Sequence, residues 1–445
     1  MSGRALPPSP PEEGVVAALN HDGEGVLREA KTVFVAGALP HERIRFRRVR
    51  RHRQHDEAEL LEVLEPSPDR VVPRCAHFGV CGGCAMQHLT PAAQLLAKQA
   101  ELAETLQRIG RVTPERWLAP LAGPVWQYRR RARLGAKYVS KRGRVLVGFR
   151  ERAKPFIAAL GRCEILAPPV DGLIEPLSVL LTGLRAREAI PQIEVAVADE
   201  AVVLVFRHLI ELVAEDRAAL SQFGARYGVH VYVQPGGVDT VAPLEGAPAI
   251  LDYRVPEEAL RFEFKPTDFV QVNGAINRAL IAEAVTLLEL HSDHRVLDLF
   301  CGLGNFTLPI ARRVREVVGI EGEAGLIARA RHNASLNGIT NASFHLANLA
   351  EAEAGGTALV GGFDRVLLDP PRAGAIEVLP RVAALGAERI VYVSCHPGTL
   401  ARDLGLLCHE LGYRLESAGV IDMFPHTTHV ESIAVLIKKT PARTR

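Results

Sequence analysis

The sequence predicts an α/β protein in which an open, mostly parallel sheet follows parts that are rich in β-strand. After Lys265, short apolar runs alternate with helix-like segments, which is typical of strands buried on both faces of a parallel sheet. Before Lys265, most runs are short, β-prone and separated by turns. The chain has 445 residues, and this length indicates about three domains rather than one.

The composition is that of a globular protein. With 48% hydrophobic and 23% charged residues, the chain can bury sizeable cores and is neither a fibre nor a disordered tail. No apolar run reaches the roughly 18 residues that a membrane helix needs. The first residues also lack the apolar core of a secretory signal. We therefore expect a cytoplasmic protein without a membrane partner.

Basic residues are concentrated in two stretches of a chain whose net charge is only +2. Seven arginines lie within residues 43–53, and eleven lysines or arginines lie within residues 129–154 beside a single acid, Glu151. Such stretches favour a polyanionic partner, because lysines and arginines that neutralise phosphates release counterions. The simpler alternative is solvated surface charge. Two separate stretches favour the polyanion.

The first part of the chain predicts a small β-barrel. Residues 1–12 are rich in Pro and Ser, and we expect a disordered tail there. Short β-prone runs fill residues 13–68, and Pro66-Ser-Pro68 has the composition of a linker. In residues 43–47, arginines alternate with apolar residues, which places the arginines on one face of a strand. A five-stranded barrel with a basic face is a common platform for single-stranded nucleic acid.

Residues 69–265 predict a cysteine-rich segment, one helix and a mainly β part. The helix covers residues 91–110, with Thr90 as N-cap, Pro91 at the first position and Gly110 at the end. Its apolar residues fall on one side, so the helix must pack against another part of the protein. Strand-like runs follow at residues 144–149, 193–197, 202–206 and 230–233.

Four buried parallel strands are expected after Lys265. They cover residues 295–300, 317–321, 365–369 and 390–394. In an open α/β sheet, ligands bind at the carboxyl ends of the strands. Polar residues that follow these strands are therefore the candidates for a functional site.

A glycine-containing turn follows the first of these strands. It reads Asp298-Leu-Phe-Cys-Gly302-Leu-Gly304, and its two glycines let the backbone pass close to a ligand. A dinucleotide fingerprint needs a third glycine where this chain has Thr307. Glu321 ends the next strand, where its carboxylate can accept hydrogen bonds from both hydroxyls of a ribose. The combination resembles the S-adenosylmethionine site of Rossmann-like methyltransferases; the alternative is an ordinary tight turn.

The segment Asp369-Pro-Pro-Arg372 ends a later strand. Its prolines block helical geometry, which keeps the carboxylate and the local carbonyls directed toward the cleft. Methyltransferases that act on exocyclic amines carry a related tetrapeptide, usually with an aromatic residue where this chain has Arg372. A plain turn at the end of a strand would look similar.

A cysteine and a glutamate complete the candidate chemistry. Cys395 follows the last parallel strand, and a thiolate there suits methylation of a pyrimidine carbon, because addition at carbon 6 makes carbon 5 nucleophilic. The reaction then needs a base that removes the carbon 5 proton, and Glu431 is the candidate. The alternatives are a small core cysteine and a surface glutamate.

Taken together, these motifs resemble the RNA uracil-5-methyltransferase family, and within it the branch that acts on 23S ribosomal RNA. The resemblance covers nearly the whole chain. The motifs that carry it, in order, are Phe269-Val-Gln271-Val-Asn273, Asp298 to Asn305, Glu321, Asn348, Asp369-Pro-Pro-Arg372, Ser394-Cys395-His-Pro and His429-Val-Glu431-Ser.

The resemblance implies a fold, a reaction and a set of site residues. It implies S-adenosylmethionine as methyl donor and the uridine at position 1939 of 23S ribosomal RNA as acceptor, flipped out of its stack. Cys395 is then the nucleophile and Glu431 the proton acceptor. We expect a monomer that acts on RNA and not on DNA. The residues that match donor contacts of the family are Gln271, Phe300, Asn305, Glu321, Asn348 and Asp369.

The resemblance also divides the chain. Residues 13–68 look like a TRAM domain, an RNA-binding barrel of OB-like type, although His41 stands where we expect glycine. Residues 69–265 are expected to form a central iron–sulfur domain, and residues 266–445 a Rossmann-like methyltransferase domain. We further expect the helix at residues 91–110 to pack on the methyltransferase domain.

Four of the seven cysteines are candidate metal ligands. Cys75, Cys81 and Cys84 form a cluster in the sequence, and Cys163 is a distant fourth member. Four thiolates suit a structural zinc ion or a [4Fe–4S] cluster equally well, and spacing does not decide between them. The family resemblance favours the iron–sulfur cluster, in a structural and RNA-organising role. Cys301 and Cys408 remain unassigned, and core packing suffices for both.

Three alternative functions stay open at this point. The same chemistry could act on another 23S ribosomal RNA uridine or on the transfer RNA T-loop, although members of the latter branch generally lack the barrel and the cluster cysteines. The chain could also be a non-catalytic iron–sulfur RNA-binding protein. Methylation of cytosine carbon 5 would predict a cysteine after the prolines, where this chain has Arg372.

Overall fold

The structure is a computed structural model that describes residues 4–5, 9–351 and 359–440. Its contacts divide the chain into two compact units. Unit 1 consists of Met1–Glu101, Phe149–Ala158 and Phe424–His429, and unit 2 consists of Leu102–Gly148, Ala159–Met423 and Val430–Arg445. Half of the tail predicted as disordered, residues 1–3 and 6–8, lies outside the described residues. Among the described residues, no helix is long and apolar enough to cross a bilayer.

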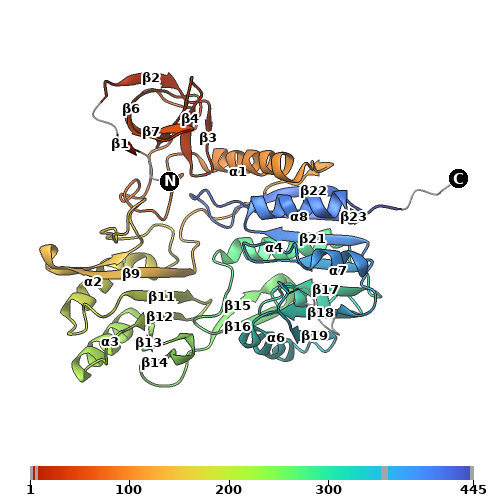
Figure 1. Cartoon of the computed structure of the whole chain (residues 1–445). Coiled ribbons are helices and arrows are strands. Elements are labelled where there is room, and N and C mark those ends of the chain that lie inside the picture. Colours follow the sequence, from red (N-terminus) through yellow and green to blue (C-terminus); the bar gives the residue numbers. More distant parts are fainter. Residues whose placement is uncertain (1–3, 6–8, 352–358, 441–445) are drawn as a thin grey trace. The chain divides into compact units, whose positions relative to one another are not determined.

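Unit 1 contains the predicted barrel (Figure 1). The chain from residue 12 to residue 19 pairs first with β6 and then with β4, so that β2 and β3 act as one bent strand that closes the ring. Around the ring this bent strand is followed by β4, β5, β7 and β6, which makes a five-stranded barrel as expected. The strands are β1 (Arg4–Ala5), β2 (Glu12–Val15), β3 (Ala18–Leu19), β4 (Glu24–Leu27), β5 (Thr32–Ala36), β6 (Arg43–Arg51) and β7 (His55–Glu65).

The barrel encloses a small aliphatic core with one aromatic ring, Phe46. Alternation along β6 buries Ile44 and Phe46 and turns the arginines between them outward. A second feature ties the chain that leaves the barrel to its wall. The fully buried carboxylate of Glu42 accepts hydrogen bonds from Arg70 at 2.5 and 2.8 Å and from the backbone N–H of Leu39. Burial opposes ionisation of Glu42, but the hydrogen bonds from Arg70 and from the N–H of Leu39 hold the pKa of Glu42 below its usual value.

The sequence predicts a basic face on β6, and acidic residues lie among the outward arginines of this strand. Glutamates and one aspartate on β2, β4–β5 and β7 pair with four of them, at N···O distances from 2.5 to 3.3 Å. The sequence pattern missed this because the acids come from neighbouring strands. Most of these pairs are exposed and contribute at most about 1 kcal/mol each, so a phosphate can compete for the arginines. The four arginines are Arg43, Arg45, Arg48 and Arg50.

His41 occupies the left-handed backbone region, with φ +70°, where glycine was expected. A side chain costs roughly 1–2 kcal/mol in this region, and the extra freedom of unfolded glycine offsets about 0.4–1 kcal/mol of that. His41→Gly is therefore expected to raise the stability of the protein by up to about 1 kcal/mol. Scanning calorimetry of the full chain measures the effect. His21→Gly is the matched control, because His21 is an exposed turn residue without positive φ and its replacement should not stabilise. An unchanged or lower melting temperature for His41→Gly would contradict the strain.

The predicted helix begins at Pro91, as expected. It comprises α1 (Pro91–Thr105) and a π-helical turn (Leu106–Gly110), and the Thr90 hydroxyl accepts a hydrogen bond from the N–H of Ala93 at 3.4 Å. In unit 1, Gln94 and Lys98 of α1 hold the loop 424–429 through hydrogen bonds to His426 and Phe424. In unit 2, Leu102 and Leu106 belong to the core of the large α/β sheet.

The central part of unit 2 is a second sheet with the order β10-β9-β11-β12-β13-β14, followed by a separate ribbon of β15 and β16. All strand pairs in this sheet are antiparallel except β12 with β13. Helices α2 (Ile174–Gly183) and α3 (Ala214–Tyr227) accompany the sheet. The strands are β9 (Arg131–Val139), β10 (Arg144–Gly148), β11 (Gln192–Val197), β12 (Val202–Arg207), β13 (His230–Gln234), β14 (Ala242–Pro243), β15 (Leu251–Val255) and β16 (Leu260–Phe264).

The C-terminal part of unit 2 is an eight-stranded α/β sheet with the order β19-β18-β17-β20-β21-β23-β22-β8. The four predicted buried strands are confirmed as β17, β18, β20 and β21, which run parallel. β23 is antiparallel to both of its neighbours. The strands are β8 (Arg116–Trp117), β17 (Arg295–Leu299), β18 (Glu316–Glu321), β19 (Ala342–Leu346), β20 (Arg365–Leu368), β21 (Arg389–Ser394), β22 (Tyr413–Ile421) and β23 (Glu431–Lys438).

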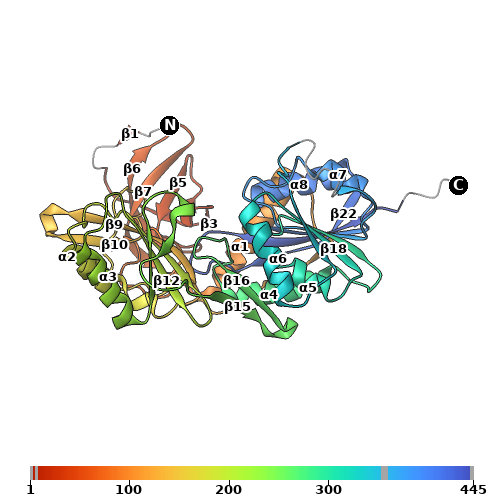
Figure 2. The same ribbon diagram turned by 90° about the horizontal axis from the view of Figure 1, so that it is seen from below.

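Helices cover both faces of this sheet (Figure 2). One face packs against α7 (Leu379–Ala384), α8 (Pro397–His409) and the π-helical turn. Helices α4 (Gly274–Leu287), α5 (Thr307–Ala311) and α6 (Ala324–Leu336) complete the fold. The π-helical turn approaches α8 so closely that a Cβ at Gly110 would overlap the carbonyl oxygen of Ala401, which explains the glycine at this position. The architecture is a Rossmann-like fold.

Candidate active site

The strand order reverses between β17 and β20, which is where open α/β sheets bind their ligands. Phe300, Glu321 and Asp369 each lie at the carboxyl end of one of the central strands. Cys395 follows β21 directly, and Glu431 begins the antiparallel β23. Because Ser432 is the register partner of Ser394, Glu431 lies at the same edge of the sheet as Cys395.

The carboxylate of Glu321 is held rigidly by backbone N–H groups. Gly302 donates to one oxygen at 3.1 Å, and Gly322 and Glu323 donate to the other at 2.7 and 3.0 Å. The turn that brings Gly302 to Glu321 requires positive φ at Phe300, Gly302 and Gly304, with values of +63°, +55° and +94°. Phe300 is not a glycine, so the turn carries strain of the kind that is found at ligand sites.

Asp298 lies beneath this turn and is fully buried. The hydroxyl of Thr307 donates to its Oδ2 at 2.5 Å, whereas its Oδ1 has no hydrogen-bond partner among the described residues. Burial raises the pKa of Asp298 to about 7, and the charges of Asp369 and Glu321 add to the rise. Thr307 therefore has a function of its own at the position where a dinucleotide fingerprint has glycine.

Asp369 is half-buried at the end of β20, and its N–H donates to the carbonyl of Leu299 at 3.3 Å. Burial raises the pKa of Asp369 to about 7 as well. Two carboxyl groups that have no cationic partner among the described residues, Asp298 and Asp369, thus lie near the ends of adjacent strands. Such a site favours a ligand that carries positive charge.

Asn305 is fixed by two residues that the sequence did not point to. Its Oδ1 accepts hydrogen bonds from the hydroxyl of Tyr253 at 2.8 Å and from Nδ2 of Asn277 at 3.0 Å. Its Nδ2 donates to Oδ1 of Asn277 at 2.9 Å. Asn277 lies one helical turn after Asn273, the N-cap of α4, and this spacing was the available signal. No feature of the sequence around Tyr253 indicated its contact.

Gln271 and Asn348 lie in loops at this part of the fold. Gln271 is half-buried in the segment that precedes α4, where Arg130 donates to the carbonyl of Val272 at 2.8 Å. Asn348 is exposed after β19, and its Nδ2 donates to Glu351 at 2.8 Å. Asn348 is thus the most exposed of the predicted donor contacts.

Cys395 and Glu431 form the reactive end of the site. The Cys395 thiol is half-buried, and Glu431 is only 7% exposed. Burial raises the pKa of Cys395, and the charges of Glu431 and Asp369 raise it further, whereas Arg372 lowers it. All three side chains are therefore close enough to Cys395 to act on its charge. A nucleophile, two carboxylates and a cation thus lie near one another at this edge of the sheet.

Comparisons with known proteins agree with this geometry. Residues 250–440 match the family described as tRNA (Uracil-5-)-methyltransferase. The chain is 52% identical over 430 residues to the 23S rRNA (uracil(1939)-C(5))-methyltransferase RlmD of Alkalilimnicola ehrlichii, which covers 96% of this chain and 97% of the relative. It is 51% identical to the protein of the same name from Stenotrophomonas maltophilia strain K279a, over 96% of this chain and 98% of the relative. The chain belongs to the RNA uracil-5-methyltransferase family.

A solved member of the family has the same fold over nearly the whole chain. The tRNA (uracil-54, C5)-methyltransferase of Pyrococcus abyssi, in complex with S-adenosyl-L-homocysteine, superimposes with a TM-score of 0.75 and 26% identity. The match covers 96% of this chain and 100% of that chain. The Rossmann-like methyltransferase fold that the sequence predicts is confirmed.

Three of the four cysteines that are candidate metal ligands lie in one stretch of unit 1. Cys75, Cys81 and Cys84 are half-buried, and the N–H of Gly83 donates to Sγ of Cys81 at 3.4 Å. Burial raises the pKa of Cys81, and the charge of Cys75 adds to the rise, so these two thiols are close together. Adjacent thiols with an N–H donor at one sulfur fit the chemistry that zinc or an iron–sulfur cluster requires. Cys163, Cys301 and Cys408 are buried in unit 2.

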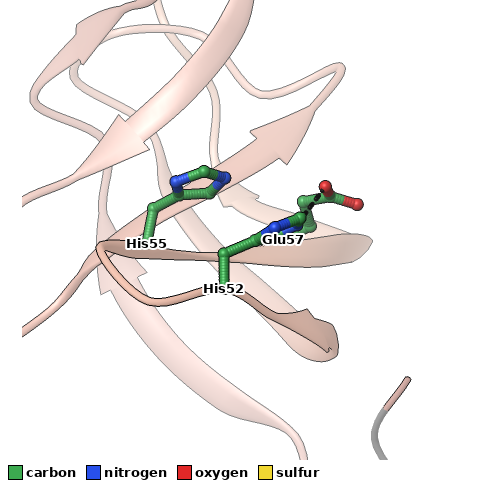
Figure 3. A group of neighbouring side chains, drawn as sticks. All are labelled: His52, His55 and Glu57. Carbon is green, nitrogen blue, oxygen red and sulfur yellow. Dashed lines mark hydrogen bonds and ion pairs between the residues drawn. The ribbon is translucent and has the colours of Figure 1, made fainter. Parts of the chain in front are cut away.

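A different group of possible ligands lies in the hairpin between β6 and β7. Figure 3 shows His52, His55 and Glu57, whose ligand atoms lie within 4.8 Å of one another. His52 already bonds to Glu57 at 2.6 Å, and Arg50 pairs with the other carboxylate oxygen at 3.3 Å. The ammonium of Lys31 donates a hydrogen bond to the carbonyl of His52 and adds a second positive charge beside the group. With these positive charges around it, the group is a hydrogen-bonded turn, and we assign no metal to it.

Arg372 is expected to limit the rise in the pKa of the Cys395 thiol. Arg372→Gln removes the charge that lowers the pKa of Cys395, so that pKa should rise and the thiolate should form only at higher pH. The pH dependence of iodoacetamide alkylation at Cys395, followed by peptide mass spectrometry, measures the shift. Arg226→Gln, at an exposed position on α3, is the control. An alkylation profile that Arg372→Gln leaves unchanged would rule out this role.

Proposed function

We propose that this enzyme transfers a methyl group from S-adenosylmethionine to carbon 5 of the uridine at position 1939 of 23S ribosomal RNA. The proposal rests on the placement of Cys395, Glu431 and Asp369 at the same edge of the sheet, where β21, β23 and β20 bring them. The names of relatives that are about 50% identical over nearly the full chain support the choice of substrate.

The proposed reaction begins with Cys395. Its thiolate adds to carbon 6 of the uracil, which makes an enolate, and carbon 5 then takes the methyl group from the sulfonium and releases S-adenosylhomocysteine. Glu431 removes the proton from carbon 5. Elimination of Cys395 restores the ring double bond and gives 5-methyluridine.

Six residues are proposed to surround the methyl donor. The carboxylate of Glu321, held by three N–H groups, suits the two ribose hydroxyls. Asp369 and the buried Asp298 suit the positive sulfonium and amino groups, because a nearby cation offsets the cost of ionising them. The proposed donor contacts are Gln271, Phe300, Asn305, Glu321, Asn348 and Asp369.

The RNA must be held while the target base leaves its stack. Residues 13–68 are proposed to be a TRAM domain that contributes to this binding, with competition between RNA phosphates and the acidic partners of its arginines. The hairpin between β9 and β10 offers Lys137, Lys141 and Arg142, which are exposed and have no ion pair among the described residues. We propose that these three cations of the second basic stretch contact the phosphate backbone of the RNA. The enzyme is proposed to work as a cytoplasmic monomer without DNA.

Residues 69–265 are proposed to be an iron–sulfur domain, and residues 266–445 the methyltransferase domain. Cys75, Cys81, Cys84 and Cys163 would hold a [4Fe–4S] cluster, which would organise the chain for RNA binding and which the methyl transfer does not consume. Iron and acid-labile sulfide measured on anaerobically purified protein distinguish the cluster from zinc. Retained activity with unchanged RNA affinity after anaerobic removal of the metal would rule out the RNA-organising role.

Methylation of unmodified 23S ribosomal RNA, with the product base located by mass spectrometry, tests the function. We expect a single 5-methyluridine at position 1939. The fold shared with the Pyrococcus abyssi enzyme makes the transfer RNA T-loop the second substrate to assay. Product on transfer RNA alone would overturn the substrate, and no product on either RNA would favour a binding protein without turnover.

A further inference from the structure

Asp403 lies in α8, the helix that starts two residues after Cys395, and it is completely buried. Its Oδ2 accepts hydrogen bonds from the N–H of Ala375 at 2.7 Å and from the hydroxyl of Tyr392 at 2.6 Å. Its Oδ1 accepts a hydrogen bond from Nε of Arg402 at 2.8 Å, and Nη2 of Arg402 forms an ion pair with the same oxygen at 2.7 Å. A buried carboxylate with three hydrogen-bond donors and an ion pair has a defined position, because moving it would leave several buried groups unsatisfied.

These contacts extend to the segment that follows Asp369-Pro-Pro. Arg402 donates from Nη2 to the carbonyl of Ala373 at 2.9 Å, and the hydroxyl of Thr399 donates to the carbonyl of Arg372 at 3.1 Å. With the Asp403 bond to Ala375, the first two turns of α8 therefore hold three positions of one short loop. Tyr392 adds β21, the strand that leads into Cys395.

Gly374 shows how tightly the loop is seated. It has φ +82°, and a Cβ there would lie 2.6 Å from both the carboxylate of Asp403 and Nη2 of Arg402. The loop can approach α8 this closely only because residue 374 has no side chain. No sequence pattern pointed to the residues after Arg372 or to Asp403.

We propose that Asp403 is a positioning residue that fixes the loop carrying Asp369 and Arg372 relative to the Cys395 thiol. The inference deepens the proposed function and rests on it for its catalytic meaning. Cys395 and the loop come from different strands, β21 and β20, and α8 connects them through Asp403 and its neighbours. The charge of Asp369 and the charge of Arg372 act on the thiol in opposite directions, so both groups must keep their distances from it if these effects are to balance. Misplacement of about 1 Å can cost about a hundredfold in rate.

A double-substitution experiment separates positioning from mere stabilisation. Arg372→Gln shifts the pH profile of Cys395 alkylation in the wild-type background by the amount that the Arg372 charge provides. In an Asp403→Asn background we expect that shift to shrink to less than half, because Arg372 is no longer held near the thiol. We also expect kcat to fall about tenfold to a hundredfold with a smaller change in KM for the donor.

Asp216→Asn is the matched control. Asp216 is also a buried helix aspartate, and it accepts hydrogen bonds from the N–H groups of Arg185 and Ala186 at 2.8 and 3.0 Å, away from the site. It should lower the melting temperature but leave both the Arg372→Gln shift and kcat unchanged. If Asp403→Asn does not fold, Tyr392→Phe removes one 2.6 Å donor and should reduce the shift partially. A full shift in the folded Asp403 or Tyr392 variant would overturn the proposal.

The alkylation readout does not involve RNA, so it stands apart from the test of the proposed function. If the enzyme methylated neither RNA, the loss of the Arg372→Gln shift in the Asp403 variant would still support positioning of the loop. Conversely, the enzyme could methylate 23S ribosomal RNA while Arg372→Gln shifts the alkylation profile of the Asp403→Asn variant fully. That result would support the proposed function and exclude the positioning role of Asp403.

Discussion

Replacing Cys395 with alanine is expected to abolish methyl transfer and leave binding of S-adenosylmethionine intact. Carbon 5 of uracil is a poor nucleophile until a thiolate adds at carbon 6, so loss of the thiol should reduce turnover by a factor on the order of 10⁴ or more. The thiol follows β21, whereas Phe300–Gly304 follows β17 and Glu321 ends β18, so its removal should not disturb the ribose end of the donor site. Methylation of 23S ribosomal RNA measures turnover, and isothermal titration calorimetry measures donor binding.

Cys408→Ala serves as the control for this substitution. Cys408 lies in α8, as Asp403 does. Its side chain packs in the core and is only 8% exposed. The variant should lose some stability and keep its turnover. Appreciable methylation by Cys395→Ala would mean that the transfer does not pass through a cysteine adduct. Loss of donor binding in that variant would mean that the thiol supports the donor site itself.

The sheet and the edge that carries the site could be predicted from the sequence because both depend on local patterns. Strands such as 295–300 and 390–394 are apolar runs of the right length, and their carboxyl ends must meet at one edge of a parallel sheet. The N-cap at Thr90 and the proline at position 91 likewise gave the start of α1, since capping depends on neighbouring residues. The expectation of glycine at position 41 also has a local basis, because the φ of His41 is positive.

The contacts that the sequence did not give join residues far apart in the chain. The arginines of β6 were expected to form a basic face, but acids from β2 and β7 lie opposite them. Tyr253 of β15 contacts Asn305 from 52 positions earlier in the chain, and no local pattern encodes such a contact. Asp403 reads as an ordinary charged residue of an amphipathic helix until the loop that it holds is known.

Replacing Glu431 with glutamine is expected to trap the enzyme on its RNA. Once the methyl group is on carbon 5, the adduct can break down only when the carbon 5 proton is removed. Glutamine has nearly the same shape as glutamate but cannot accept that proton. Turnover should fall about 10²–10⁴-fold, and a covalent RNA–protein complex should accumulate and survive a denaturing gel. Its mass should include the added methyl group.

The structure makes this substitution a demanding test. Glu431 is 7% exposed and lies opposite Ile421 in the sheet, so few other groups can reach the same position. Glu410→Gln, at the exposed end of α8, should show normal turnover and no stable complex. If Glu431→Gln turns over normally without a complex, the base lies elsewhere, and Asp369 becomes the carboxylate to replace next. If instead no complex forms and turnover is lost, Glu431 acts before the methyl transfer, by holding the uracil or the thiol in place.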